Sequence, residues 1–321
     1  MRGMKSRTVR LVLRKKIDAW LDSIEDPLVK EVAADNVIIT GGAIVSLLLG
    51  EAPNDYDLYL KDRAAVITVA NYYVRQFNLR KGTLKTTAVA SCNPEVREVS
   101  ALNIRGEEER RVIIYMKSAG VAGEQQENYH YFEGQPDEVT EDFMASLNVD
   151  PMGLAETMIE DVKPKNKKYR PVFFSDNAIS LSDKVQVIIR FHGEPKDIHR
   201  NYDYAHTTCS YDYKENELIL PQEALVAIMS KNLIYRGSLY PIASIFRLRK
   251  FIDRGWRISA GEMLKIMWQI NRIDLDNHEI LRDQLIGVDS AYMGQLISAL
   301  KNAPKRVDDT YLAKLIDEIF E

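Results

Sequence analysis

The sequence predicts an α+β protein in which a mixed-sheet half, residues 1–220, is followed by an all-helical half, residues 221–321. Two observations lead to this prediction. Short β-branched runs alternate with amphipathic segments in the first half, whereas the periodic segments after Pro221 have helical spacing. The hydrophobic fraction of 45% and the charged fraction of 28% are ordinary for globular proteins, so we expect a packed core.

The first half begins with elements whose ends are marked by glycine and proline. Apolar residues recur at helical spacing in Ser6–Ile24, and Pro27 breaks that pattern. A β-branched run stops at Gly41-Gly42, and the compact apolar segment after it closes at Gly50, a common end for a helix. The expected elements are helices Ser6–Ile24 and Leu28–Ala34, strand Asn36–Thr40, helix Ala43–Leu49, strand Asp55–Lys61 and helix Arg63–Phe77.

The middle of the chain is acidic and only weakly periodic. Residues 119–165 contain eleven acidic residues and two lysines. We therefore expect an insertion over about residues 119–168. Within it, short helices are expected near Glu141–Leu147 and Gly153–Met158. Before it, Arg111–Lys117 has the pattern of a strand, and Glu107–Arg110 is expected to form a charged turn.

Further strands are expected before the helical half begins. Asp183–Phe191 has the strongest strand pattern, and Asn201–Tyr213 alternates as a strand does. The other two expected strands are Pro171–Phe174 and Leu218–Leu220. The expected helices that follow are Gln222–Asn232, Tyr240–Arg254, Ala260–Ile270, His278–Gln284, Ala291–Asn302 and Asp309–Phe320.

The composition also indicates where the protein works. The sequence contains no stretch of eighteen apolar residues, and no apolar signal-peptide segment follows the basic N-terminus Met1–Lys16. The two cysteines, Cys92 and Cys209, lack metal-ligand spacing and are too few for a disulfide framework. We therefore expect a cytoplasmic protein without a membrane partner, in the host cytoplasm if the protein is encoded by a virus.

The glycine pair has the features of a phosphate-binding turn. Gly41-Gly42 separates an expected strand from an expected helix, so backbone N–H groups lie free at the helix N-terminus. Glycine lets a phosphate approach the backbone closely, and the helix dipole favours an anion there. Ser46 follows one turn later and adds a hydroxyl. Gly41, Gly42 and Ser46 are therefore candidate nucleotide-binding residues.

Two aspartates follow on the next expected strand. Asp55 and Asp57 are spaced by two, so their carboxylates should point to the same face of a sheet. Adjacent carboxylates suit Mg²⁺, with Mn²⁺ as an alternative ion, and such a pair supports two-metal catalysis. Acidic alternation on an exposed strand edge is the structural alternative. The preceding Gly41-Gly42 favours the metal site.

Strand, Gly41-Gly42, helix and Asp55-x-Asp57 together resemble the polymerase-β-like nucleotidyltransferase superfamily. The spacing is also similar to that of tRNA CCA-adding enzymes, although Val45-Ser46 stands where those enzymes carry Arg-Asp. Over most of its length the chain resembles nucleotidyltransferase-like proteins of large bacteriophages. The segments that carry this wider likeness are Phe174–Ala178, Val185–Arg190 and Leu239–Pro241. The resemblance implies a nucleotidyltransferase core, with Asp55 and Asp57 as metal ligands and Gly41-Gly42 as the triphosphate loop.

The same resemblance implies a third carboxylate from a later, adjacent strand. The best candidate is Asp203, at the start of the expected strand Asn201–Tyr213, and Asp212 is the second choice. Such a residue would act as a general base for the acceptor hydroxyl or as a further metal ligand. If Asp203 is an ordinary edge residue, the site is a two-acid variant or is catalytically retired.

The helical half supplies further candidates by analogy. In related enzymes this part contributes basic and aromatic groups to the triphosphate and the base, which implicates Lys231, Tyr240 and Arg247 as nucleotide-binding residues. The alternative is a solvated helix face. The histidines at 192, 199 and 206 cluster in sequence, but their spacings match no common zinc pattern.

These residues together predict an Mg²⁺-dependent nucleotidyltransferase. The expected reaction moves a nucleoside monophosphate from a nucleoside triphosphate to an acceptor hydroxyl and releases pyrophosphate. Three alternatives remain open at this point. The acceptor is an RNA 3′ end; the acceptor is a protein or small molecule, or the product is a signalling nucleotide; or the chain is a non-catalytic nucleotide-binding or structural module of the same fold.

Overall fold

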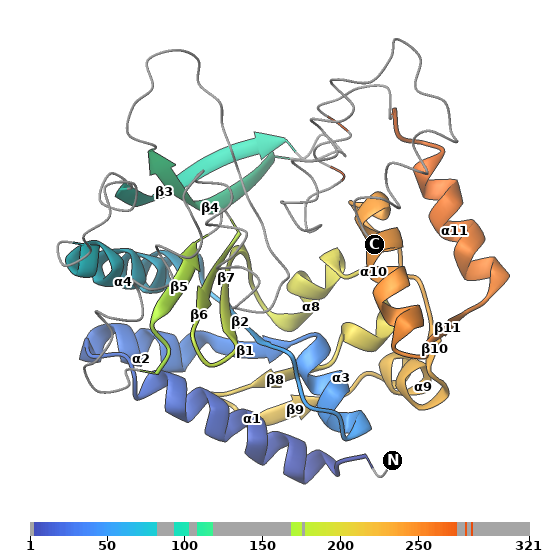
Figure 1. The fold of residues 1–321 in the computed structure, drawn as a ribbon, viewed down its shortest axis with the longest axis horizontal. Coiled ribbons are helices and arrows are strands. Elements are labelled where there is room, and N and C mark those ends of the chain that lie inside the picture. Colours follow the sequence, from blue (N-terminus) through green and yellow to red (C-terminus); the bar gives the residue numbers. More distant parts are fainter. Residues whose placement is uncertain are drawn as a thin grey trace, which may run out of the picture.

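The computed structural model describes residues 3–81, 93–102, 108–117, 168–174 and 177–274, together with Ile280 and Gln284. Its centre is a seven-stranded sheet with the order β5-β6-β7-β2-β1-β8-β9 (Figure 1). β2 and β7 pair in parallel, and the other neighbouring pairs are antiparallel, so the sheet is mixed. The strands are β1 Val37–Thr40, β2 Tyr56–Leu60, β5 Pro171–Phe174, β6 Ala178–Leu181, β7 Val185–His192, β8 Ser210–Asp212 and β9 Glu217–Ile219.

Helices cover one face of this sheet because the strands turn their apolar side chains to it. Ile39 of β1, Leu58 of β2 and Val187 of β7 are fully buried in the main core. Leu13 of α1 and Val66 of α4 belong to the same core, and Figure 1 shows both helices on that side of the sheet. The helices of this layer are α1 Ser6–Leu21, α2 Pro27–Asn36 and α4 Arg63–Lys81.

Capping residues set the ends of the short helices. Pro27 is the first residue of α2, and the Asp26 carboxylate accepts hydrogen bonds from the backbone N–H groups of Leu28 and Val29. α3, Gly42–Leu49, ends at Gly50, whose φ of 75° is left-handed. α3 therefore leads directly into the loop before β2.

Two antiparallel strands form a separate ribbon beside the main sheet. β3, Asn93–Leu102, pairs with β4, Glu108–Lys117, along its whole length. Val112 and Ile114 of β4 are buried in the main core. The sequence did not predict β3, and the expected charged turn Glu107–Arg110 is wrong because residues 108–110 belong to β4.

The segment between β7 and β9 also differs from the prediction. Asn201–Tyr213 is not one strand: it contains two short helices, η1 and η2, and only β8 at its end is extended. Residues 203–206 and 208–212 are all buried, so the alternation of residue types in the sequence does not mark a half-exposed strand here. The short helices are α8 Pro195–Ile198, η1 His199–Asn201 and η2 Ala205–Thr207. β6 was likewise not expected.

The described chain after β9, up to residue 274, is mainly helical, as predicted. α9 Gln222–Ser230, α10 Pro241–Asp253 and α11 Ala260–Ile270 are joined by a two-stranded parallel sheet of β10 Asn232–Leu233 and β11 Arg257–Ile258. The predicted helices near Glu141–Leu147 and Gly153–Met158 lie outside the described residues, as do those at Ala291–Asn302 and Asp309–Phe320 and most of His278–Gln284.

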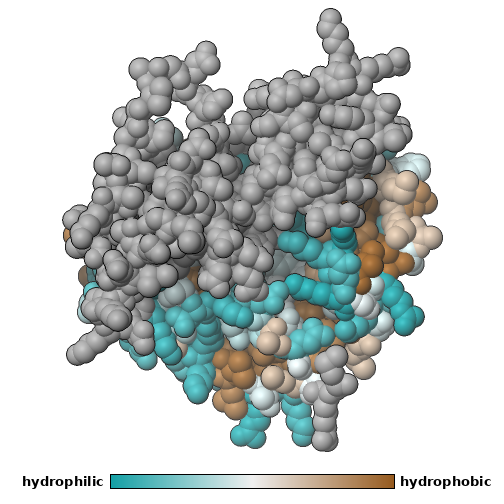
Figure 2. Space-filling model, in the orientation of Figure 1, coloured by the Kyte–Doolittle hydropathy of each residue, from teal (hydrophilic) through white to brown (hydrophobic). Residues whose placement is uncertain are grey.

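The prediction of an α+β protein with a mixed sheet is therefore confirmed. The domain boundary near residue 220 stays a prediction. Among the described residues, no helix has the length and apolar composition needed to cross a bilayer. Tan and brown apolar residues gather over α11 on the right of Figure 2, where Met263, Leu264, Met267 and Trp268 are exposed.

Candidate functional site: a polar row at the end of β2

A row of polar side chains crosses the face of the sheet opposite the helices. Ser180 pairs with Gln186, Gln186 with Asp57, and Thr40 with Ser210. Thr40 lies opposite Asp57, because the antiparallel register of β1 and β2 places Ile39 opposite Leu58. Paired residues share a face, so Ser180, Gln186, Asp57, Thr40 and Ser210 form one row over five neighbouring strands.

The neighbouring row on the same face is apolar, which makes the polar composition of this row unusual. The next row on the same face contains Ala178, Ile188, Tyr59 and Ile38, which pack together in a second apolar cluster. Within the polar row, Thr40 and Ser210 are fully buried, and Ser180 and Gln186 are each 6% exposed. Burying polar groups is costly unless they are bonded, so the sheet has a polar site at this position.

The two aspartates lie together at the middle of this row, where β2 begins. β2 begins at Tyr56, so Asp57 is within the strand, whereas Asp55 directly precedes it. Strand alternation keeps both side chains on one face. Gln186 Nε2 lies 3.5 Å from Asp55 Oδ2, at the long end of hydrogen-bond distances. The pair is therefore brought together as the sequence predicted, with Gln186 as an unpredicted neighbour.

Gly41 lies directly beside Asp57. Its φ of 91° and ψ of −147° fall in a region that is essentially restricted to glycine. A Cβ atom at this position would lie 3.7 Å from the Tyr202 hydroxyl oxygen and 3.8 Å from Asp57 Oδ2. The predicted phosphate loop and the predicted metal ligands are thus adjacent.

The start of α3 is open beside this turn. Gly42 is the first residue of α3, and a Cβ atom there would meet nothing within 4 Å. The first N–H groups of a helix have no intrahelical partners and favour an anion. Ser46 lies one turn further and is half-buried. The arrangement suits a phosphate chain placed between the N-terminus of α3 and Asp57.

Tyr202 and His199 form a wall of the site that the sequence did not reveal. The Tyr202 hydroxyl donates to the Tyr59 hydroxyl at 3.0 Å, and burial raises the pKa of Tyr202, so it stays protonated. Thr40 Oγ1 donates to the carbonyl oxygen of Cys209 at 2.8 Å. His199 Nε2, 2.7 Å from Thr40 Oγ1, must then be the donor to it.

His199 is neutral in this wall. Burial, helped by the positive charge of Arg236, lowers the pKa of His199 to about 4. Tyr202 was expected to lie in the strand Asn201–Tyr213 and His199 in the turn before it, so the approach of these two residues to β1 and β2 could not be anticipated. The signal in the sequence was a cluster of aromatic and histidine residues.

The prediction that Asp203 opens an adjacent strand is wrong. Asp203 lies in the turn between η1 and η2, and the strand beside β2 is β7. Its Oδ2 accepts a hydrogen bond from Arg247 Nε at 2.7 Å, and its carbonyl oxygen accepts one from the backbone N–H of Arg236 at 2.7 Å. Asp203 is therefore committed to the helical half, in a buried ion pair.

Asp212, the second choice, is also engaged elsewhere. It forms an ion pair with Lys61, and its Oδ1 accepts from the backbone N–H of Glu215 at 3.1 Å. The residue of β7 that is in register with Asp57 is Gln186, an amide. In the part of the chain that the structure describes, no three His, Cys, Asp or Glu side chains are grouped as metal ligands. Among the described residues, the acids that the structure brings together here are thus Asp55 and Asp57.

Two carboxylates still fit Mg²⁺. This ion is commonly held by one or two carboxylates together with water and substrate phosphates rather than by a complete protein cage. Asp55 and Asp57 would hold it, next to the glycine turn where those phosphates would lie. The donor chemistry therefore fits, provided that the nucleotide completes the coordination.

The three candidates from the helical half are found in different places. Lys231 Nζ lies 3.5 Å from Glu51 Oε1, beside the loop between α3 and β2. Arg247 binds Asp203, and the Tyr240 hydroxyl accepts from Arg190 Nη2 at 2.5 Å. Lys231 is therefore close to the site's own loop, whereas contacts of Arg247 and Tyr240 connect the helical half to the rest of the fold.

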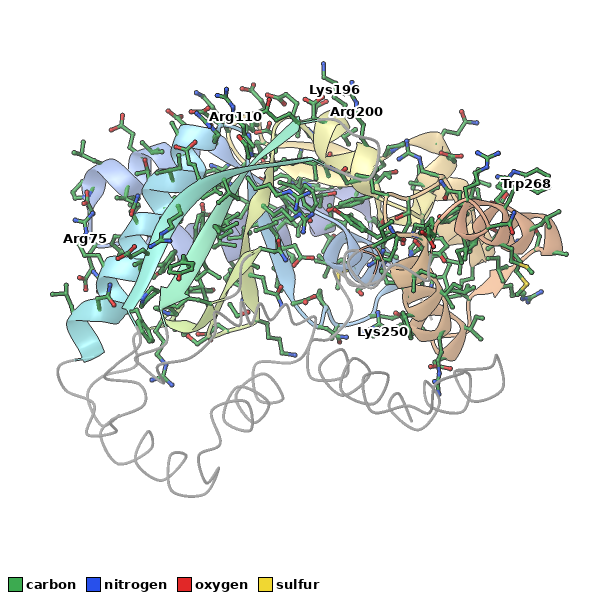
Figure 3. All side chains as sticks on the ribbon, turned by 90° about the horizontal axis from the view of Figure 1, so that it is seen from above. Arg75, Arg110, Lys196, Arg200, Lys250 and Trp268 are labelled. Carbon is green, nitrogen blue, oxygen red and sulfur yellow. The ribbon has the colours of Figure 1, made fainter. Side chains whose placement is uncertain are left out.

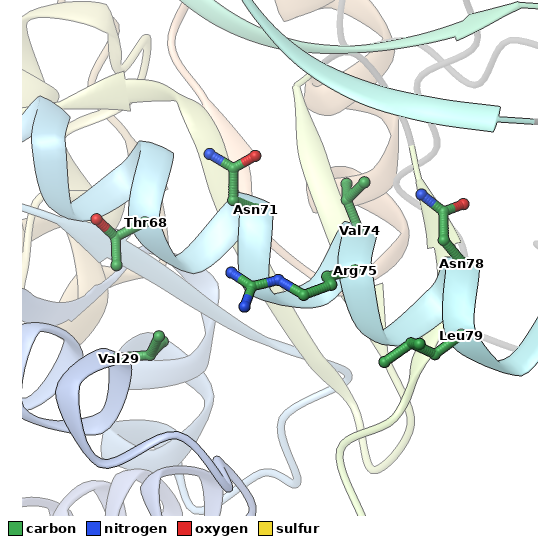
Figure 4. Close-up of a pocket in the computed structure, with 7 residues that line it drawn as sticks. All are labelled: Val29, Thr68, Asn71, Val74, Arg75, Asn78 and Leu79. Atoms are coloured by element: carbon green, nitrogen blue, oxygen red, sulfur yellow. The ribbon is translucent and has the colours of Figure 1, made fainter.

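A groove lies elsewhere, along α2 and α4 (Figure 4). It has a volume of about 650 Å³, and its lining includes Thr68, Asn71, Arg75 and Asn78. Arg75 lies at one end of the molecule in Figure 3, and Trp268 of α11 lies at the other. The groove belongs to the helix-covered face, so it is separate from the polar row.

Fold and site together define a class. The protein is α+β, and its glycine turn lies beside the Asp55-x-Asp57 sequence at the start of β2, as expected for nucleotidyltransferase-like proteins. The chain belongs to the Gabija anti-defense 2 family, whose sequence profile matches residues 11–231. That span contains the entire polar row, the glycine turn and Lys231, but neither Tyr240 nor Arg247.

A relative and a solved structure were also found. "Gabija anti-defense 2" of Bacillus phage SPbetaL7 is 23% identical over 138 residues, which are 42% of this chain and 33% of that protein. The match thus spans about a third of the relative's length. The Thermotoga maritima CCA-adding enzyme complexed with tRNA is 11% identical, with a TM-score of 0.38, and the match covers 94% of this chain and 53% of that chain.

Proposed function

We propose that this chain is a Mg²⁺-dependent nucleotidyltransferase that moves a nucleoside monophosphate from a nucleoside triphosphate to an acceptor hydroxyl. The observation that carries the proposal is the contact between the glycine turn and the polar row. A Cβ atom on Gly41 would lie 3.8 Å from Asp57 Oδ2, so the proposed phosphate and metal sites would be adjacent. A purely structural row would not need an open helix N-terminus beside it.

Each residue has a defined task in this proposal. The N–H groups at Gly42 and the following residues bind phosphate oxygens, and Lys231 adds positive charge from the side of the loop before β2. Asp55 and Asp57 hold Mg²⁺, which when bound neutralises phosphate charge and polarises the reacting oxygens. Tyr202, kept protonated by burial, limits the site on the other side of Gly41.

The proposed reaction is an in-line displacement at the α-phosphorus. A bond forms between the acceptor oxygen and the α-phosphorus, and the bond from that phosphorus to the bridging oxygen breaks. Pyrophosphate leaves with the electron pair, and the acceptor proton passes to solvent water. Most of the acceleration comes from positioning and charge neutralisation, because the protein forms no covalent intermediate.

The family supports a biological context for this activity. The phage relative is named for an activity against a defence called Gabija, and we propose that this chain also counters that defence. Nucleotidyl transfer to a component of the defence would give an inhibitory modification. An RNA 3′ end and a small-molecule or signalling product are the competing acceptors, and a non-catalytic nucleotide-binding module is the alternative class.

Transfer of label from each α-³²P-labelled triphosphate tests this proposal. The full chain is incubated with Mg²⁺ or Mn²⁺, and separately with host RNA and host protein, because the labelled fraction identifies the acceptor class. Asp55→Ala combined with Asp57→Ala should reduce transfer by at least about 100-fold, since both metal ligands are removed. Asp35→Asn is the matched control, because Asp35 is an exposed acid in a surface ion pair with Lys214.

Two outcomes contradict the proposal. Transfer that survives in the double variant would show that the chemistry occurs elsewhere. Absence of transfer to every acceptor, together with absence of metal binding, would favour the non-catalytic module.

A further inference from the structure

One short segment, residues 199–202, approaches both the glycine turn and the strand that carries Asp57. We propose that His199, in this segment, is a positioning residue: by donating a hydrogen bond to Thr40, it holds the glycine turn in the conformation that receives the triphosphate. The inference rests on the proposed function, because it concerns the phosphate-binding part of the same site. In this role His199 acts through Thr40 and not on the substrate.

The Thr40 hydroxyl connects His199 to the turn. Thr40 is the last residue of β1, it is fully buried, and it directly precedes Gly41. Thr40 Oγ1 donates to the carbonyl oxygen of Cys209 at 2.8 Å and accepts from His199 Nε2 at 2.7 Å. A buried hydroxyl that loses such a partner pays a desolvation penalty. The two hydrogen bonds therefore fix the end of β1 at the point where the chain turns.

Tyr202 contacts the same turn at Gly41 itself. A Cβ atom on Gly41 would lie 3.7 Å from the Tyr202 hydroxyl oxygen. That hydroxyl donates to the hydroxyl of Tyr59 on β2 at 3.0 Å. Tyr59 follows Asp57 by two residues on the same strand. The segment 199–202 thus connects the glycine turn to the strand of the proposed metal ligand.

Apolar packing anchors this segment to the sheet. Ile198, which directly precedes it, is 1% exposed and belongs to the second apolar cluster with Ile38 of β1 and Tyr59 of β2. The ring centroids of His199 and Tyr202 lie 5.1 Å apart, so the two side chains also support each other. A positioning group must itself be held by its surroundings. His199 is held by both β1 and β2 through these contacts.

The role of His199 requires a hydrogen-bond donor and not a charge. Burial lowers the pKa of His199 to about 4, so at pH 7 the ring is neutral and carries one proton. Because Thr40 donates to Cys209, that proton lies on Nε2. His199→Gln keeps an N–H donor on a side chain of similar reach, whereas His199→Met has a similar length and no donor. The two variants therefore form a matched pair.

Isothermal titration of the full chain with Mg²⁺ and each nucleoside triphosphate tests this inference without an activity assay. His199→Met should bind about tenfold more weakly than the wild type, and His199→Gln should stay within about twofold of it. Urea unfolding of both variants is the second readout. A histidine that only packs would lower the stability of both variants and leave the affinity of the folded protein unchanged.

Substitutions of Thr40 test whether His199 acts through the hydroxyl. Thr40→Val keeps the shape of the side chain and removes the hydroxyl, so it should weaken triphosphate binding about as much as His199→Met does. Thr40→Ser keeps the hydroxyl and is the matched control. The double variant Thr40→Val with His199→Met should bind no more weakly than either single variant, because both remove the same hydrogen bond. Additive losses would overturn the inference.

The outcomes distinguish this inference from the proposed function. Asp57→Asn should abolish triphosphate binding. If it does, but His199→Met binds like the wild type or His199→Gln binds as weakly as His199→Met, only the role of His199 is overturned. If the wild type binds no triphosphate, or if Asp57→Asn leaves binding unchanged, the proposed site itself is overturned and the inference fails with it.

Discussion

At the scale of single residues, the site depends on one backbone conformation. Gly41 joins β1 to α3 at a φ of 91°, and this turn places the start of α3 beside Asp57. The sequence predicted the glycine pair and both aspartates because these are local signals. It could not predict that Tyr202, far along the chain, would approach Gly41. Contacts between residues so far apart in the sequence depend on how the whole sheet is assembled.

Gly41→Ala should therefore destabilise the protein by about 1–3 kcal/mol, because alanine must adopt a backbone conformation restricted to glycine. The added Cβ atom itself would make only ordinary van der Waals contacts. Gly42→Ala is the matched control: it lies at the first position of α3 with open space around it. Urea unfolding should show little change for Gly42→Ala, and equal losses in the two variants would contradict this account.

A second residue-scale prediction concerns acid stability. His206 is 1% exposed and packs between Phe251 and Trp256, and among the described residues neither ring nitrogen has a hydrogen-bond partner. Burial lowers the pKa of His206 to about 4, against the attraction of Asp203. The unfolded chain therefore binds more protons between about pH 6.5 and pH 4, so stability present above this window is lost as the pH falls through it.

His206→Phe should flatten that loss, because phenylalanine fills the same aromatic cluster without taking up a proton. The substitution should reduce the slope of the free energy of unfolding against pH by at most about 1.4 kcal/mol per pH unit. The measurement is the free energy of unfolding at pH 7, 6, 5 and 4. His199 titrates in the same direction, so part of the slope should remain. An unchanged slope in His206→Phe would show that His206 is not buried as a neutral ring.

At the scale of elements, regular strands were predictable and irregular ones were not. β1, β2 and β7 have β-branched runs bounded by turn residues, and their approximate positions were predicted. β6, Ala178–Leu181, contains a single β-branched residue, Ile179, and the segment of η1 and η2 imitates strand alternation. That segment carries Asp203, so the error in the element also gave Asp203 a wrong position, at the start of a strand. The partner of Asp203, Arg247, lies on α10.

The ion pair between Asp203 and Arg247 predicts a structural role for this aspartate. Asp203→Asn should lower the free energy of unfolding by about 3 kcal/mol, because it leaves the largely buried Arg247 guanidinium without its carboxylate. Mn²⁺ binding measured on the same variant should be retained. Adding Arg247→Met should restore part of the stability, as expected for two partners in one pair. Lost Mn²⁺ binding with unchanged stability would instead make Asp203 a metal ligand.

At the scale of the whole molecule, the two halves meet beside the site. The backbone N–H of Ala205 donates to the carbonyl oxygen of Ile234 at 3.0 Å, and Lys231 reaches Glu51 in the loop before β2. The polar row itself could not be read from the sequence, because its register combines strands that are distant in the chain. Besides Asp57, the local signal of the row in the sequence is Gln186, a polar residue within an apolar run.

The central claim is that the polar row, and not the groove along α2 and α4, binds the nucleoside triphosphate. Isothermal titration of the full chain with Mg²⁺ and each triphosphate tests this directly. Asp57→Asn should abolish binding, whereas Arg75→Ala, which alters the groove at the other face of the molecule, should bind as the wild type does. Binding that persists in Asp57→Asn and disappears in Arg75→Ala would contradict the account.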